Sequence, residues 1–160
     1  MIQLMSLDAT SLSALRQGAA SVQGAVIQKG AMPPAVLFDL AAQALAAGKP
    51  LLWHAPWLIV SADGQWVVGA MGFKAPPQDG LVEIGYNVAP AWQGRGVAST
   101  AVRQLLALAA EQPALRMVRA ETAADNVASR RVLEKNGFHL AGRHHTEADG
   151  WVDDWRYTLS

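Results

Sequence analysis

The chain has 160 residues, of which 51% are hydrophobic; this excludes an intrinsically disordered protein and predicts a single domain over residues 1–160. Its 13 basic residues balance 13 acidic ones, which argues against a general nucleic-acid binder, and the absence of cysteine excludes disulfides, cysteine-ligated zinc and thiol catalysis. No apolar run reaches membrane-spanning length and the N-terminus does not resemble a signal peptide, so we expect a cytoplasmic protein that binds neither membrane nor nucleic acid.

The first half of the chain predicts a strand, two helices and an antiparallel meander. The expected elements cover residues 1–7, 10–16, 35–47, 57–61, 65–73 and 81–88. Thr10 is the expected N-cap of the first helix, and Pro33 with Pro34 favour the start of the second, where no backbone donor is needed. Asp63-Gly64 is a hairpin signal between two of the strands, whereas residues 21–32 carry no clear pattern.

The second half alternates strands with helices. After a glycine-containing loop, the expected elements cover residues 99–111, 117–122, 127–135, 138–144 and 151–159. Apolar residues share one face of the first of these helices: Val102, Leu105, Leu106 and Ala109. In the second helix, capped by Asp125 or Asn126, helical spacing predicts that four residues cover the sheet: Val127, Arg130 through its aliphatic stem, Val132 and Leu133. This order of elements predicts a mixed sheet with helices packed on it.

The loop over residues 90–96 is the most informative segment. It leaves a strand, carries Gly94 and Gly96, and opens a helix. A helix N-terminus has unpaired N–H groups and a partial positive charge, and glycines let the backbone approach a ligand closely. The loop therefore favours a phosphate or pyrophosphate, although a tight turn without a ligand would use the same residues.

Two nucleotide-type ligands compete for this loop. Gly94-x-Gly96-x-x-Ser99 is close to the dinucleotide fingerprint, and Glu121 on the next strand could hold a ribose. Against that hypothesis, the third small position is Ser, and too few residues follow for a doubly wound parallel sheet. The alternative is coenzyme A.

A family resemblance favours coenzyme A. Residues 93–98, Gln-Gly-Arg-Gly-Val-Ala, resemble the pyrophosphate loop of the GNAT acetyltransferase superfamily, and residues 84–90 resemble the strand before it. Residues 126–138, from Asn126 to Phe138, are similar to the N-x-x-S…EK-x-GF helix, most of all in its ribosomal-protein N-terminal acetyltransferase (RimJ/RimL-like) subfamily. The resemblance implies an α/β (α+β) fold with a central mixed, mostly antiparallel twisted sheet of about seven strands and about four flanking helices.

The resemblance also implies which residues bind acetyl-CoA as cosubstrate. The pyrophosphate would lie on backbone N–H groups of Gln93, Gly94, Arg95, Gly96, Val97, Ala98 and Ser99. The pantetheine arm would pair like a strand with Tyr86, Asn87 and Val88, whose last N–H would also serve the oxyanion. Asn126 matches the family residue that binds the arm, and a plain helix cap is the alternative role.

Catalytic roles follow from the same resemblance. Ser129 lies one helical turn after Asn126 and matches the family residue placed near the sulfur, so we expect it to be the partner of the leaving thiolate. For the general base, Glu121 ranks first, Glu147 second and Glu83 third, and an ordered water is an alternative to all three. Glu83 is one residue out of step with the family carboxylate, which on a strand means the opposite face.

The acceptor side of the site is less defined by the sequence. Residues 32–38 lie where the family's variable helices shape the acceptor groove, and four tryptophans are candidates for its walls: Trp53, Trp57, Trp92 and Trp151. The His and acidic residues between 144 and 154 match no ligand motif, and neighbouring His144 and His145 would point apart, so no metal site is expected.

The sequence thus predicts an N-acetyltransferase that moves an acetyl group from acetyl-CoA to a primary amine, on a protein N-terminus or a small molecule. Attack would be direct, in a ternary complex, because no cysteine is available as an acyl carrier. Dimers are frequent in the family, which favours a homodimer. The alternatives are a non-catalytic coenzyme A-binding sensor and a dinucleotide-binding oxidoreductase.

Overall fold

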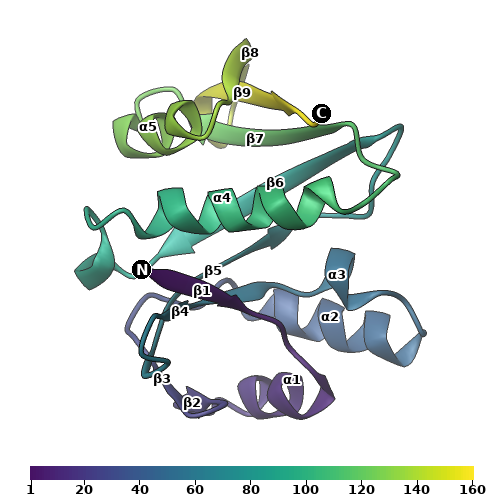
Figure 1. The fold of residues 1–160 in the computed structure, drawn as a ribbon, viewed down its shortest axis with the longest axis vertical. Coiled ribbons are helices and arrows are strands. Elements are labelled where there is room, and N and C mark those ends of the chain that lie inside the picture. The colour runs from purple at the N-terminus through teal and green to yellow at the C-terminus, as the bar shows by residue number, and fades with distance from the viewer.

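One twisted mixed sheet runs through the computed structural model, which describes residues 1–160 (Figure 1). Its main path has seven strands in the order β1-β4-β5-β6-β7-β9-β8, and the β2–β3 hairpin joins this path where β3 lies parallel to the start of β5. Neighbours along the main path are antiparallel except for β6 and β7, which are parallel. The predicted mixed, mostly antiparallel sheet of about seven strands is therefore confirmed.

The strands are β1 (Ile2–Met5), β2 (Ser21–Val22), β3 (Ala25–Ile27), β4 (Trp57–Ser61), β5 (Trp66–Phe73), β6 (Leu81–Val88), β7 (Met117–Ala123), β8 (His139–Thr146) and β9 (Gly150–Thr158). The helices are α1 (Ala9–Arg16), α2 (Val36–Ala46), α3 (Leu51–His54), the 3-10 helix η1 (Pro90–Trp92), α4 (Val97–Ala110) and α5 (Val127–Lys135). Sequence patterns miss β2, β3 and α3, because segments of two to four residues are too short to show periodicity. None of the helices combines the length and the apolar character that a membrane crossing requires.

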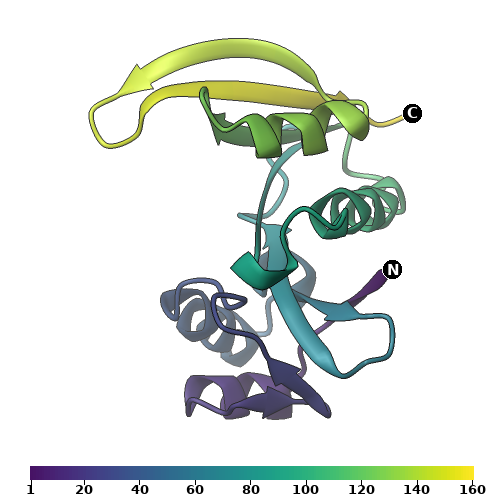
Figure 2. The same ribbon diagram turned by 90° about the vertical axis from the view of Figure 1, so that its left-hand side faces the viewer.

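Two apolar cores lie on opposite faces of the sheet. Helix α4 packs on one face and the α1–α2 pair on the other, as Figure 2 shows. The predicted apolar face of α4 is confirmed, since Val102, Leu105, Leu106 and Ala109 are all buried. Helix α4 begins at Val97, two residues before the expected start, because Gly96 with φ of +76° ends the loop and caps the helix itself.

Two expectations about helices are wrong. Asp8, not Thr10, caps α1: its carboxylate accepts a hydrogen bond of 2.7 Å from the amide of Ser11, three residues on, as an N-cap requires. In α5, Val127 is 56% exposed and does not cover the sheet. Only Leu133 of this helix is fully buried, because α5 touches the sheet mainly through its second half.

The parallel pair β6 and β7 separates halfway along. Leu81 to Ile84 pair with Met117 to Ala120, and the ladder ends there. Beyond that point β6 continues against β5 and β7 continues against β9. The two central strands therefore open into a gap, and the candidate site is built around it.

Candidate active site

Backbone groups of β6 line the gap. The amide of Lys74 donates to the carbonyl of Glu83 (2.8 Å) and the amide of Ala89 donates to the carbonyl of Val68 (2.7 Å), so the odd-numbered residues of β6 face β5. Backbone direction alternates along a strand, and Tyr86 and Val88 therefore direct their N–H and C=O groups into the gap. This edge of β6 is the one that the sequence predicts for a pantetheine arm.

The Gly94–Gly96 loop lies at the N-terminus of α4. Both glycines have φ of +76°, and a Cβ atom on either would meet no other atom within 4 Å. No side chain caps α4, so the amides of its first turn at Val97, Ala98 and Ser99 have no helical partner. Together with the helix dipole, these open amides form a cradle for an anion.

The polar side chains of the loop are already engaged. The Gln93 Nε2 atom donates to the carbonyl of Val88 (3.0 Å), which links the loop to the strand edge and leaves the Val88 amide facing the gap. Arg95 is exposed and lies over the ring of Trp92, 4.9 Å from its centroid. Buried Ser99 accepts hydrogen bonds from Asn136 Nδ2 on its carbonyl (3.1 Å) and its Oγ (3.2 Å). These residues therefore offer mainly their backbone to a ligand.

Tyr86 carries a feature that sequence reasoning missed. Its hydroxyl is the single buried side-chain polar atom of the chain without a hydrogen-bond partner. Burial raises the pKa of the Tyr86 phenol, and the Ser129 hydroxyl, which is close by but does not meet hydrogen-bond geometry, offsets part of this rise. A buried donor without a partner is costly, so the structure brings to the gap a phenol that lacks an acceptor. Together with the open glycine loop, this observation fits a cosubstrate that runs along the gap.

Helix α5 carries Asn126 and Ser129 at its N-terminal end. Asn126 is the N-cap, and its Oδ1 atom accepts a hydrogen bond of 3.1 Å from the amide of Ser129. The cap role foreseen for Asn126 is thus confirmed, and its amide nitrogen has no partner within the chain. Ser129 is half-buried beside Tyr86, which is where a partner of the leaving thiolate is expected.

Asn87 points away from the gap. Its side-chain amide donates to the carbonyls of Gly30 (3.3 Å) and Ala31 (3.0 Å), and its backbone faces β5. A Cβ on Gly30 would come within 2.8 Å of Pro90, so the segment at Gly30 packs tightly behind the start of the 90–96 loop. Asn87 thus holds the segment that leads into α2, a role that its position in the motif did not indicate.

Three carboxylates gather around Arg119 on β7. Its guanidinium contacts Glu121, Glu83 (3.0 Å) and Asp154 (2.9 Å). Partial burial lowers the pKa of Arg119, but the hydrogen bond and charges of these carboxylates outweigh it and raise the pKa overall. Glu83 and Glu121 therefore lie on the same face of the sheet and share one arginine.

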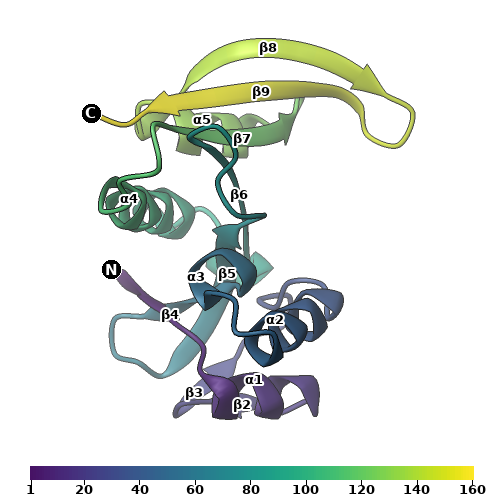
Figure 3. The same ribbon diagram turned by 90° about the vertical axis from the view of Figure 1, so that its right-hand side faces the viewer.

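Glu147 does not join this group. It is exposed in the turn between β8 and β9, and in Figure 3 this turn projects beyond the other strands. No hydrogen bond or ion pair ties its side chain to the gap. The base candidates that the structure brings together are Glu121, just beyond the end of the β6–β7 ladder, and Glu83 within it, each in an ion pair with Arg119.

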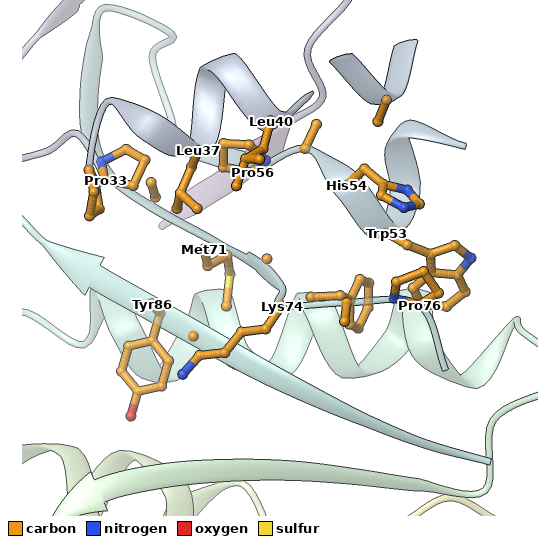
Figure 4. Close-up of a pocket in the computed structure, with 18 of the residues that line it drawn as sticks. Pro33, Leu37, Leu40, Trp53, His54, Pro56, Met71, Lys74, Pro76 and Tyr86 are labelled. Carbon is orange, nitrogen blue, oxygen red and sulfur yellow. The ribbon is translucent and has the colours of Figure 1, made fainter. Parts of the chain in front are cut away.

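A cavity of about 1240 Å³ opens on the α2 side of the sheet (Figure 4). Its floor is formed by β5 and by Gly85, Tyr86 and Asn87 of β6, and its roof by α2 and α3. Met32 and Leu37 of the segment 32–38 line it, and of the four tryptophans that the sequence offers as walls of an acceptor pocket only Trp53 does so. The cavity reaches the strand edge that faces the gap.

Trp151 is 57% exposed and stacks edge-on against His145, 5.2 Å between centroids, away from the cavity. No three of the His, Asp and Glu side chains lie close enough together to hold a metal ion. The sheet also lacks the parallel order of a doubly wound fold, so the dinucleotide-binding oxidoreductase is wrong as a hypothesis.

A sheet that splays beside a glycine loop at a helix N-terminus is the arrangement that the resemblance to coenzyme A-dependent acetyltransferases implies for this chain. The family described as "Acetyltransferase (GNAT) domain" matches residues 8–139, and the chain belongs to this family. An uncharacterized N-acetyltransferase, YjdG, of Bacillus subtilis (strain 168) is 32% identical over 97 residues, which are 60% of this chain and 57% of that protein. The chain thus matches little more than half the length of this relative.

Solved structures share the fold across nearly the whole chain. A spermidine N-acetyltransferase SpeG chimera from Vibrio cholerae and hSSAT superposes with a TM-score of 0.72 at 16% identity, covering 98% of this chain and 95% of that one. RimL, a ribosomal L7/L12 alpha-N-protein acetyltransferase solved with coenzyme A, gives a TM-score of 0.71 at 20% identity, covering 99% and 94%.

Proposed function

We propose that this chain transfers the acetyl group of acetyl-CoA to a primary amine, by direct attack in a ternary complex. The observation that carries the proposal is the gap between β6 and β7. It has the anion cradle of α4 at one end and the cavity under α2 along its other side. Membership of the GNAT family supports acetyl-CoA as the occupant of the gap. When bound, acetyl-CoA supplies an acyl carbon activated as a thioester.

The loop and strand edge would hold the cosubstrate. The first-turn amides from Val97 to Ser99 would bind the pyrophosphate, and Tyr86 and Val88 would pair with the pantetheine amides through their backbone. The Val88 amide would also donate to the oxygen of the acyl group as negative charge develops there. Asn126 would contribute its free amide nitrogen to the arm.

Proton transfer would use both sides of the gap. The amine nitrogen bonds to the acyl carbon, the carbon–sulfur bond breaks, and the amine proton passes to Glu121 directly or through water. The leaving thiolate needs a donor, and the Ser129 and Tyr86 hydroxyls are the two beside it. We assign the thiolate to this pair, with the unpartnered phenol of Tyr86 as a donor that only the folded chain reveals.

A calorimetric titration with acetyl-CoA tests the proposal. The wild-type chain should bind saturably, and Gly96→Val should lose binding because a branched side chain fills the cradle. Gly18→Val is the matched control, since Gly18 has a similar φ of +82°, equally open surroundings and a place after α1, away from the loop. Equal loss of acetyl-CoA binding in both variants would show that backbone strain, and not a filled cradle, causes the loss in Gly96→Val.

Turnover separates the enzyme from the coenzyme A-binding sensor. Release of free thiol on addition of an amine panel supports the transferase, whereas binding without turnover on any amine supports the sensor. Absence of acetyl-CoA binding by the wild-type chain would overturn both. The homodimer, the cytoplasmic location and the single-domain boundary stay predictions.

A further inference from the structure

The cavity under α2 contains no acidic side chain. Among its 23 lining residues the charged or titratable side chains other than Tyr86 are Lys49, His54 and Lys74. The nearby carboxylates are engaged elsewhere: Asp39 on α2 pairs with Arg16 of α1 at 3.0 Å, and Glu83 pairs with Lys74 at 2.8 Å and with Arg119. A second ammonium group on an acceptor would find no counter-charge in this cavity.

The roof of the cavity is unusually apolar for a surface helix. The sequence of α2, VLFDLAAQALA, is apolar on nearly all sides, although the helix packs on the core only through Phe38, Ala41 and Ala44. Leu37 and Leu40 line the cavity and remain 38% and 50% exposed. Exposed apolar side chains that converge on a cavity indicate an apolar ligand.

The inner end of the cavity is the reacting end. Gly85 and Tyr86 belong both to the cavity floor and to the part of β6 that faces the gap. The stem of Lys74 lies across Gly85, whose added Cβ would come within 3.0 Å of Lys74 Cε (Figure 4). The opposite end, at Trp53, His54 and Pro76, is walled by rings. An acceptor entering here would place its amine at the gap and its body among α2, α3 and Trp53.

We infer that the acceptor is a primary amine carried on an uncharged, apolar body, and not a polyamine or another polycation. This inference rests on the proposed acetyl transfer and adds the class of the acceptor. Two sources share this chemistry: a free apolar amine and the N-terminus of a peptide that begins with an apolar residue.

The test compares acceptors that differ in a single group. Hexylamine and cadaverine have equal numbers of heavy atoms, and cadaverine replaces the terminal methyl of hexylamine with a second ammonium. Using thiol release with the wild-type chain, kcat/KM for hexylamine should exceed that for cadaverine by about tenfold or more, because the second ammonium would be desolvated without a partner. Phenethylamine should be accepted and spermidine should not. A short peptide that begins with phenylalanine separates the peptide source from the free amine.

A charge placed in the roof should change this preference. Leu40→Asp supplies a carboxylate in the cavity and should reduce the hexylamine preference by about tenfold. Leu45→Asp is the matched control: it puts the same charge on α2 at a leucine that is 37% exposed and does not line the cavity, so the preference should persist.

Preference of the wild-type chain for cadaverine or spermidine would overturn the inference while leaving the proposed transferase intact. Binding of acetyl-CoA without turnover on any of these amines would instead remove the proposed function, and this inference with it. If Leu40→Asp does not fold, the comparison of hexylamine with cadaverine on the wild-type chain still tests the inference.

Discussion

Two features of Tyr86 bear on the proposed acetyl transfer. Its backbone lies on the strand edge that faces the gap, as its place in the motif predicts, whereas its buried hydroxyl lacks a partner and lies beside Ser129. A phenol with a raised pKa stays protonated at neutral pH and can donate to a developing thiolate. Ser129 alone would be a weaker acid for this step.

Tyr86→Phe tests this role. Removal of the hydroxyl should lower kcat by about 100-fold, as loss of an acid-base group typically does, with little change in the dissociation constant for acetyl-CoA. Tyr157→Phe is the control, because Tyr157 packs on Phe138 with 5.5 Å between ring centroids, outside the gap. Unchanged kcat in Tyr86→Phe would assign the thiolate to Ser129 alone.

At the scale of elements, α4 and α5 attach to the sheet very differently. Helix α4 buries seven residues, whereas α5 buries only Leu133 and keeps Arg130 over the ring of Trp155 at 5.7 Å. A helix held by so few buried residues can shift when a ligand binds. Asn126 and Ser129 lie at its N-terminal end, which has no buried residue. The position of these two residues therefore depends on the anchor at Leu133.

Leu133→Ala should destabilise the protein by about 2–5 kcal/mol, because it leaves a cavity under a fully buried side chain. Val127→Ala, on the exposed side of the same helix, should change the free energy of unfolding by less than about 0.5 kcal/mol. Urea unfolding measures both. A comparable loss in Val127→Ala would mean that this end of α5 packs more closely than the structure shows.

Over the whole molecule, a row of ion pairs crosses the sheet on the face that carries the base candidates. It runs from Lys74, the residue after β5, through Glu83, Arg119 and Asp154 to Arg156, and so joins β6, β7 and β9. Burial favours a higher pKa for Asp154, but the hydrogen bonds and charges of Arg156 and Arg119 outweigh it and lower the pKa.

Because the pKa of Asp154 is lowered, the free energy of unfolding should depend on pH in the acidic range. Because the folded-state pKa of Asp154 lies below its unfolded value of about 3.9, its contribution is present above that value and is lost as pH falls through the folded pKa. Urea unfolding between neutral pH and pH of about 3 should show falling stability below pH of about 4. Asp154→Asn should be less stable at neutral pH and should show a shallower decline. If the free energy of unfolding of Asp154→Asn falls with pH as steeply as that of the wild-type chain, Asp154 does not contribute to the loss of stability in acid.

Most of the strands and the Gly94–Gly96 loop could be predicted from the sequence because their signals are local. Residues 81–88 match β6 at both ends, and the glycines of the loop have the positive φ that their pattern indicates. The base could not be predicted in the same way. Glu147 matches a family position, but the long β8–β9 hairpin carries it away, and strand register alone brings Glu83 and Glu121 to one arginine.

The family, the order of the longer elements and the glycine loop before α4 could be predicted from the sequence, since each depends on neighbours in the chain: turn residues, helical spacing and backbone freedom at glycine. Three other properties depend on how segments distant in the chain pack: the Tyr86 hydroxyl lacks a partner, Asn87 binds the loop before α2, and the cavity under α2 contains no carboxylate. These properties arise where segments distant in sequence meet. Packing there decides which side chains are buried, which polar groups are hydrogen-bonded and which charges are paired.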